Sequence, residues 1–173
     1  MKTSLWKEML VAAVGVSVLS GTTWAGGSGC SNATLKGQYA FGVTAYTPAG
    51  FPNGPPQVIT GTTIYDGNGH FTQRDYTGDG LRATPPETDF STGETGTYTV
   101  NSNCTGSAVL NLNVPGVPPG LSTGVIKLIF VISDGGRHIH GVVSEFTPPF
   151  SNAPVPTQTS FDSWQVASDE GEQ

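Results

Sequence analysis

Hydrophobic and polar residues alternate along most of the chain after position 35. In the segment 36–47, for example, Tyr39 and Phe41 lie two positions apart, and Tyr46 has the opposite parity. This period of two is typical of a β-strand with one buried face. Eight such segments, rich in Thr, Val, Ile, Tyr and Phe, are predicted as strands: 36–47, 57–65, 70–77, 94–101, 106–113, 124–133, 137–147 and 157–166.

Turn residues separate these segments and exclude long helices. The chain has 24 glycines and 13 prolines, so that no window after position 25 supports a long amphipathic helix. Three joins, 66–69, 101–106 and 134–136, are short and rich in Asp, Asn and Gly, as in β-hairpins. Sequential hairpins give antiparallel neighbours. The sequence therefore predicts an all-β fold, a single eight-stranded antiparallel up-and-down β-barrel, with a β-sandwich as the alternative.

The longer joins indicate where a site would lie. They span 48–56, 78–93 and 114–123. If the strands alternate in direction, all three leave the barrel at one end, and the tight turns close the other end. A barrel with one open mouth is the expected result, and ligands commonly enter such barrels through the mouth.

One predicted strand is apolar on both of its faces. It reads Val-Ile-Lys-Leu-Ile-Phe-Val-Ile over 125–132. One face is expected to look into the barrel, and the other to be covered by a loop or by a second copy of the chain. The pattern therefore allows a homodimer.

The first residues have the pattern of an export signal. Lys2 and Lys7 precede an apolar run over 9–19 that is too short to cross a bilayer. Small residues at Thr23 and Ala25 predict cleavage after Ala25. We therefore expect a signal peptide over 1–25, one β-barrel domain over 26–166 and an acidic C-terminal tail over 167–173. The protein is expected to be periplasmic or extracellular, with no membrane insertion after cleavage.

The charge and the missing motifs exclude several classes of function. The net charge is −6 at pH 7, and only 12% of the residues are charged. Nucleic acid is not an expected partner, because its binding depends on Lys and Arg that neutralise phosphate. The chain has no phosphate loop, dinucleotide fingerprint or His-Glu-x-x-His motif. No cofactor is expected.

Cys30 and Cys104 are the two cysteines of the chain. In an oxidising compartment a disulfide between them is the first expectation. A reactive thiol pair is the alternative, but the Cys-x-x-Cys spacing typical of such pairs is missing.

Aromatic residues supply the candidate ligand-binding cavity. They are large apolar groups spread over several predicted strands. The candidates are Tyr39, Phe41, Tyr65, Phe71, Tyr98 and Phe130. Which parity of each strand faces inward stays open, since a one-residue bulge inverts it.

His138 and His140 are weak candidates for metal ligands, and no metal site is predicted. Their spacing of two places both on one face of a strand. Glu145 lies at an odd spacing from both, so without a bulge it faces the other side. His70 would have to approach from another strand.

Four acidic residues cluster around the second long join, and solvated loop charges are the favoured interpretation. A pair of carboxylates there could otherwise perform acid–base chemistry or hold calcium. The four are Asp75, Asp79, Glu87 and Asp89.

Three segments, 30–41, 64–71 and 96–106, resemble those of a group of exported bacterial proteins. That group is similar to the allene oxide cyclase barrel-like, broadly lipocalin-like families. The resemblance implies an eight-stranded barrel around an apolar cavity. The wider group includes cyclases of oxidised fatty acids and of polyketides. No catalytic residue of a cyclase matches a position in this chain, and the catalytic residues stay unknown.

Three functions follow as hypotheses. The first is an exported barrel that binds a small, mostly apolar molecule in its lumen. The second is a cyclase or isomerase that uses the same cavity, which a buried Tyr, His or carboxylate with a shifted pKa would favour. The third is a structural or surface-interaction protein whose barrel is filled by its own side chains.

Overall fold

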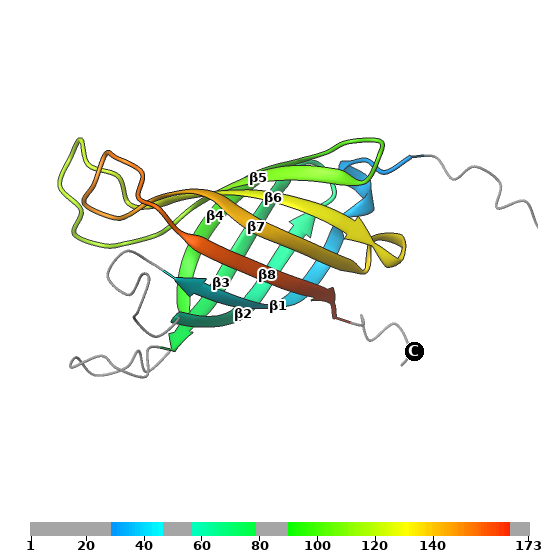
Figure 1. Cartoon of the computed structure of the whole chain (residues 1–173), viewed down its shortest axis with the longest axis horizontal. Helices are drawn as coiled ribbons and strands as arrows, with labels where there is room; N and C mark the ends of the chain where they lie inside the picture. Colours follow the sequence, from blue (N-terminus) through cyan, green and yellow to red (C-terminus); the bar gives the residue numbers. More distant parts are fainter. Residues whose placement is uncertain (1–28, 47–56, 79–89, 167–173) are drawn as a thin grey trace, which may run out of the picture.

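The strands form one closed antiparallel barrel in the order β1 to β8 (Figure 1). The computed structural model describes residues 29–46, 57–78 and 90–166. The strands are β1 (Lys36–Tyr46), β2 (Gln57–Asp66), β3 (His70–Gly78), β4 (Ser91–Val100), β5 (Thr105–Asn111), β6 (Val125–Ser133), β7 (His138–Thr147) and β8 (Gln158–Gln165). The predicted barrel is confirmed, and the alternative of a sandwich is wrong.

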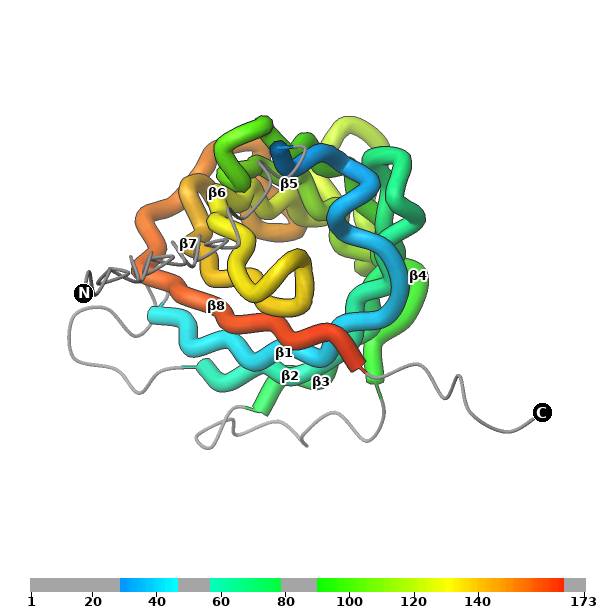
Figure 2. Tube along the Cα trace, turned by 90° about the vertical axis from the view of Figure 1, so that its right-hand side faces the viewer, coloured from blue at the N-terminus to red at the C-terminus, as the bar shows by residue number. Residues whose placement is uncertain are grey.

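The last strand pairs back to the first and closes the barrel. β8 runs antiparallel to β1 over eight residue pairs, from Tyr39 opposite Gln165 to Tyr46 opposite Gln158. Figure 2 views this closed ring of strands from one end. Closure removes both edge strands, so no strand of the ring offers an unpaired edge to another chain.

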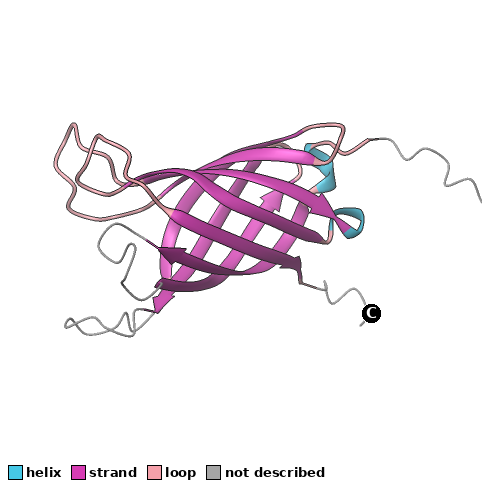
Figure 3. Cartoon of the chain, viewed as in Figure 1, coloured by secondary structure: helices cyan, strands magenta, loops and turns pink. Residues whose placement is uncertain are grey.

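Helix is limited to two short turns in the described residues. These are the 3-10 turns η1 (Asn32–Thr34) and η2 (Asp134–Gly136), both at the same end of the barrel (Figure 3). Within the described ranges, no helix has the length and apolar character needed to cross a membrane. The expected signal peptide over 1–25 and the acidic tail over 167–173 lie outside the described residues and stay predictions.

β4 begins earlier than the sequence suggested. We expected its start at Glu94, but the strand starts at Ser91. Gly93 allows this because it adopts a φ of 84°, a left-handed value that glycine accepts without steric cost. The Asn113 side chain then donates a hydrogen bond to the Thr92 carbonyl oxygen at 3.0 Å. A glycine interpreted as the end of a loop therefore lies inside a strand.

The two ends of the barrel differ, as the loop lengths predicted. The turns after β2, β4 and β6 are short and lie at one end, which we call the closed end. The joins 112–124 and 148–157 lie at the other, the open end (Figure 1). Most of the expected long joins 48–56 and 78–93 lies outside the described residues.

The two described joins at the open end are tied to each other. The Phe150 amide donates to the Ser122 carbonyl oxygen at 2.9 Å, and the Asn152 side chain donates to that of Gly120 at 3.1 Å. The amide of Val155 then returns to the Phe146 carbonyl oxygen at 2.8 Å. These bonds build one side of the mouth.

The chain before β1 plugs the closed end. Leu35 is fully buried. Asn32 of η1 accepts a hydrogen bond from the Val100 amide at 2.8 Å. The Tyr98 hydroxyl donates to the Leu35 carbonyl oxygen at 2.9 Å, and that of Tyr39 donates to the carbonyl oxygen of Gly136 in η2. Both 3-10 turns are thus held over the barrel by buried tyrosines.

A disulfide joins the plug to the turn between β4 and β5. It links Cys30 and Cys104, whose Cα atoms are 4.9 Å apart and which are 74 residues apart in sequence. This confirms the predicted pair. In the chain-entropy model a ring of this size stabilises the fold by about 4 kcal/mol, because it restricts the unfolded chain.

Phenylalanine rings lie on glycines of neighbouring strands inside the barrel. The register places each of four glycines directly opposite a phenylalanine. A Cβ on any of these glycines would overlap the ring. The absence of a side chain on the glycine lets the ring pack against the backbone of the neighbouring strand, which gives a cross-strand contact. The pairs are Phe41 with Gly61, Phe71 with Gly96, Phe130 with Gly106 and Phe161 with Gly141.

These pairs predict the effect of adding one methyl group. In Gly96→Ala the new Cβ would overlap both the Phe71 ring and the Val109 carbonyl oxygen. We expect a loss of about 1–3 kcal/mol in the free energy of unfolding, as for other overpacked cores. Urea unfolding followed by circular dichroism measures it. Gly42→Ala is the control, because a Cβ there meets nothing within 4 Å. Equal stability of the two variants would contradict the ring-on-glycine packing.

Candidate functional site

The open half of the barrel encloses a cavity of about 120 Å³. Its wall is mostly apolar and includes side chains from seven of the eight strands. The lining residues on β1 to β3 are Phe41, Val43, Gln57, Ile59, Thr63, Tyr65, Phe71, Gln73 and Asp75. Those that follow are Leu110, Ile126, Leu128, Val143, Phe146, Thr157, Thr159, Phe161 and Ser163. The cavity therefore lies inside the ring, on the side of the long joins.

The cavity ends on a cluster of tyrosines near the closed end of the barrel. Tyr65 contacts Tyr39 and Tyr98 edge to face, with ring centroids 5.2 and 5.1 Å apart. Phe71 lies beside Tyr65 at 5.5 Å. Edge-to-face packing is favourable because the positive ring edge meets the negative ring face. The cluster separates the cavity from the plugged end.

Burial sets the ionisation of these tyrosines. Loss of hydration raises the pKa of Tyr65 well above its ordinary value, and the neighbouring Tyr39 and Tyr98 add to the effect. Burial is also the main reason that the pKa of Tyr39 and that of Tyr98 are raised. The phenols therefore stay neutral at physiological pH.

A polar group from β2, β3 and β4 projects into the lumen. The Gln73 side-chain nitrogen lies 3.2 Å from an Asp75 carboxylate oxygen and 3.1 Å from one of Glu94, and it donates to both. The Gln73 carbonyl oxygen accepts a hydrogen bond from Thr63 at 3.2 Å. Glu94 is buried, with 5% of its surface exposed. One amide thus organises two carboxylates beside the cavity.

The six predicted cavity residues separate into two groups. All six face the barrel interior, and all are buried. Phe41, Tyr65 and Phe71 line the cavity. Tyr39, Tyr98 and Phe130 are not among its lining residues and pack in the hydrophobic core instead. Their contact with a ligand stays a prediction.

The polar group in the lumen is not predicted by the sequence pattern. Asp75 was interpreted as a solvated loop charge, but it lies on β3 and lines the cavity. Gln73 and Asp75 have the same parity as Phe71, so alternation alone would have placed all three inside once one of them was assigned. Asp79, Glu87 and Asp89 lie outside the described residues.

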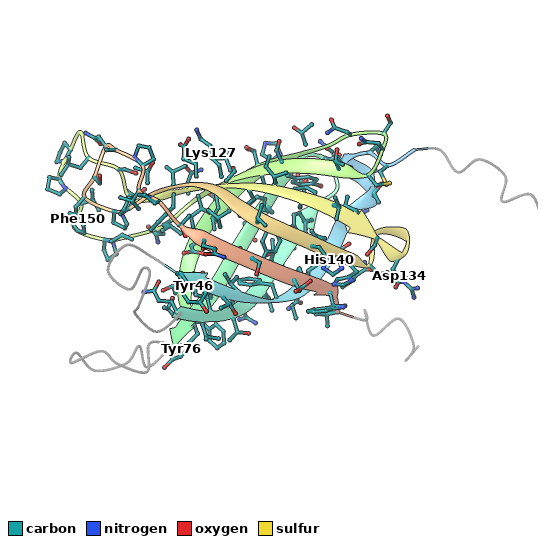
Figure 4. All side chains as sticks on the ribbon, in the orientation of Figure 1. Tyr46, Tyr76, Lys127, Asp134, His140 and Phe150 are labelled. Atoms are coloured by element: carbon teal, nitrogen blue, oxygen red, sulfur yellow. A yellow bond between two sulfur atoms is a disulfide. The ribbon has the colours of Figure 1, made fainter. Side chains whose placement is uncertain are left out.

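The histidines lie on the outer wall of the barrel. His138 and His140 share the outer face of β7, and Figure 4 shows His140 near the closed end, close to Asp134. Their neighbour is Asp162 of β8, which lies opposite His140 in the register. His70 does not approach them and lies beside Asp66, with Nδ1 3.4 Å from a carboxylate oxygen. Sequence reasoning missed Asp162.

A bulge changes the expected position of Glu145. The register between β6 and β7 shifts at Lys127 and Leu128. The shift brings Glu145 to the outer face, where it pairs with Lys127 at 2.8 Å, and it directs Phe146 into the cavity. The odd spacing from His138 therefore fails as a guide beyond the bulge.

The outer face of β6 is exposed within the described residues. Ile129 and Val131 each have about half of their surface exposed, as does Val142 on the adjacent β7. A loop does not cover these positions in the described part of the chain. The homodimer stays a prediction.

Sequence comparison gives no family for this chain. The chain matches no protein-family model. No curated protein matches it. Among solved structures it is similar to the S-type phycobiliprotein lyase CPES from Guillardia theta, with a TM-score of 0.47 and 6% sequence identity. That alignment covers 80% of this chain and 92% of the lyase.

So distant a likeness carries no inference about function. The barrel class rests on the strand pairing of this chain. The barrel implied by the allene oxide cyclase resemblance is confirmed, and membership of that family stays a prediction.

The tyrosine cluster predicts a loss of stability in alkali. In the unfolded chain these phenols ionise near pH 10, whereas the raised pKa values keep them protonated in the folded barrel. The stabilisation is complete below pH 10 and is lost as the pH rises toward the folded values. Tyr65→Phe removes one such group. Above pH 10, the free energy of unfolding of this variant should fall less steeply with pH than that of the parent protein. The two slopes should differ by up to about 1.4 kcal/mol per pH unit.

Urea unfolding between pH 8 and pH 11.5 tests this expectation. Equal slopes for Tyr65→Phe and the parent protein would show that Tyr65 does not titrate differently in the two states.

Proposed function

We propose that this chain is an exported β-barrel protein that binds a small, mostly apolar molecule in the open half of its lumen. The observation that carries the proposal is the cavity of about 120 Å³ between the tyrosine cluster and the long joins. A barrel filled solid by its own side chains would not leave this space. The third hypothesis therefore fits only the closed half.

The size and wall of the cavity define the ligand class. An apolar cavity of about 150 Å³ accommodates benzene, so the enclosed space here suits a ring or a short branched hydrocarbon. Phe41, Ile59, Leu128 and Phe161 supply apolar contacts on different sides of the ring. A longer molecule would place its remainder in the mouth.

Two features support an exported protein. The disulfide between Cys30 and Cys104 is typical of an oxidising compartment. The charged and apolar pattern of residues 1–25 has the order of a secretory signal. The ligand is therefore expected to meet the protein in the periplasm or outside the cell.

Filling the cavity should abolish binding. Leu128 lines the cavity on β6, and Leu128→Trp would occupy its volume. We expect the affinity for benzene, measured by isothermal titration calorimetry, to fall at least about tenfold, because the larger side chain occupies the space that the ligand needs. Ile129→Trp is the matched control, because Ile129 is the next residue on the same strand and faces outward with 50% of its surface exposed.

Native mass spectrometry of the parent protein from its exported fraction should reveal a retained small molecule that Leu128→Trp lacks. Binding that is unchanged in Leu128→Trp, or lost equally in Ile129→Trp, would place the ligand elsewhere.

A cyclase or isomerase is the second candidate. The Gln73, Asp75 and Glu94 group favours it, because carboxylates beside an apolar cavity are suited to proton transfer. In Asp75→Asn the side-chain amide cannot take up and release a proton as a carboxylate does, whereas the shape of the side chain is kept.

A turnover test distinguishes the two candidates. Host extract is incubated with parent protein, with Asp75→Asn and with Asp134→Asn, a change in a closed-end turn. An enzyme of this class forms a product isomeric with its substrate, and its rate should fall at least about 100-fold in Asp75→Asn alone. Chromatography with mass detection measures it. If the parent protein forms no isomer, the cavity serves binding only.

A further inference from the structure

Three metal-ligating side chains meet on the outer wall of the barrel, on the other side from the lumen. His138 and His140 share a face of β7 because side chains alternate along a strand. The register brings Asp162 of β8 opposite His140, and Trp164 opposite His138. The next inward residues on the same two strands, Ile139 and Ser163, are buried. The cluster is thus separate from the cavity.

The donor atoms converge closely. One nitrogen from each imidazole and one oxygen of Asp162 lie within 4.8 Å of one another. His138 Nε2 lies 3.5 Å from Asp162 Oδ1, and His140 Nδ1 is closer to the same oxygen. Among the described residues, His138, His140 and Asp162 form the group of three metal-ligating side chains whose donor atoms converge.

Hydrogen bonds of regular geometry do not form where the three side chains converge. His138 Nε2 and Asp162 Oδ1 are buried atoms without a hydrogen bond of regular geometry, and the polar contacts they make are the ion-pair contacts among these three side chains. Leaving buried polar atoms unpaired costs free energy, and native structures rarely do so. A cation that accepts lone pairs from both atoms would remove that cost.

We propose that His138, His140 and Asp162 form a binding site for a divalent transition-metal ion, and that the ion is Zn²⁺. Two imidazole nitrogens and one carboxylate oxygen are a common donor set for zinc. Donors of a tetrahedral zinc ion with bonds of about 2.0–2.1 Å lie about 3.3 Å apart, so small side-chain rotations bring these three into place. The fourth position is open to water or to an outside ligand.

The surroundings hold the His138 side chain in place. The His138 ring stacks on the Trp164 indole, with centroids 4.5 Å apart and planes 17° from parallel. Only 18% of its side-chain surface is exposed, against 51% for His140. A ligand fixed by packing loses little conformational freedom when the ion binds, which favours affinity.

A bound ion would also join two strands. The pairing between β7 and β8 runs from His138 opposite Trp164 to Val142 opposite Ser160. The ion would bridge this pairing at the closed end, so zinc binding should stabilise the folded barrel.

Titration with zinc tests the proposal. Isothermal titration calorimetry of the metal-free protein with ZnCl₂ should show one site per chain. His140→Ala and Asp162→Asn should each weaken it at least about tenfold, because each removes one of three ligands. His70→Ala is the matched control. It disrupts another histidine–carboxylate pair, His70 with Asp66, in which two donors meet instead of three.

A spectroscopic readout identifies the ligands directly. With Cu²⁺ in place of Zn²⁺, electron paramagnetic resonance should show two nitrogen ligands in the parent and one in His140→Ala. Circular dichroism of the metal-free variants checks that the fold is kept. No saturable zinc binding by the parent would overturn the proposal. So would binding that both ligand variants retain, or a loss that His70→Ala shares.

Discussion

The pairing of β8 with β1 is the constraint on which the rest of the structure depends. Without it the sheet would have two edges and two exposed faces. With it, each strand residue is assigned either to the lumen or to the outer wall, since successive side chains point to opposite faces. The tyrosine cluster, the cavity and the histidine cluster all follow from this one division. The two candidate sites share strands but lie on opposite sides of the barrel wall.

Closure also makes an interior that must be filled or left open. At eight strands the lumen has little more width than its own side chains need. This chain fills one half with the plug around Leu35 and with buried tyrosines, and it leaves the other half partly empty. Stability and capacity are thus assigned to different ends.

Much of the fold could be predicted because it depends on local signals. Turn residues fixed the number of strands and their hairpin order, and the loop lengths fixed which end is open. Parity is local too, and it would have placed Gln73 and Asp75 inside beside Phe71. Their partner Glu94 is twenty-one residues beyond Gln73, and only the strand pairing shows that the two meet.

Other parts of the sites depend on the register between strands, which cannot be read from any single segment. Asp162 lies twenty-two residues after His140, and it becomes a neighbour only once β7 and β8 are aligned. The bulge beside Lys127 inserts one residue and reverses the inside–outside assignment of Glu145 and Phe146. Alternation along one strand cannot reveal such a reversal. Predictions from sequence were therefore accurate for elements and incomplete for contacts between them.

The plug gives the molecule a direction. The chain enters the described barrel at Cys30 and leaves it after Gln165, and both points lie at the closed end, opposite the mouth. Anything attached at either point, whether a tag, a second domain or a solid support, would therefore sit behind the barrel. The mouth would still face away from the attachment point. A barrel of this architecture can be attached through its closed end while its open end stays accessible.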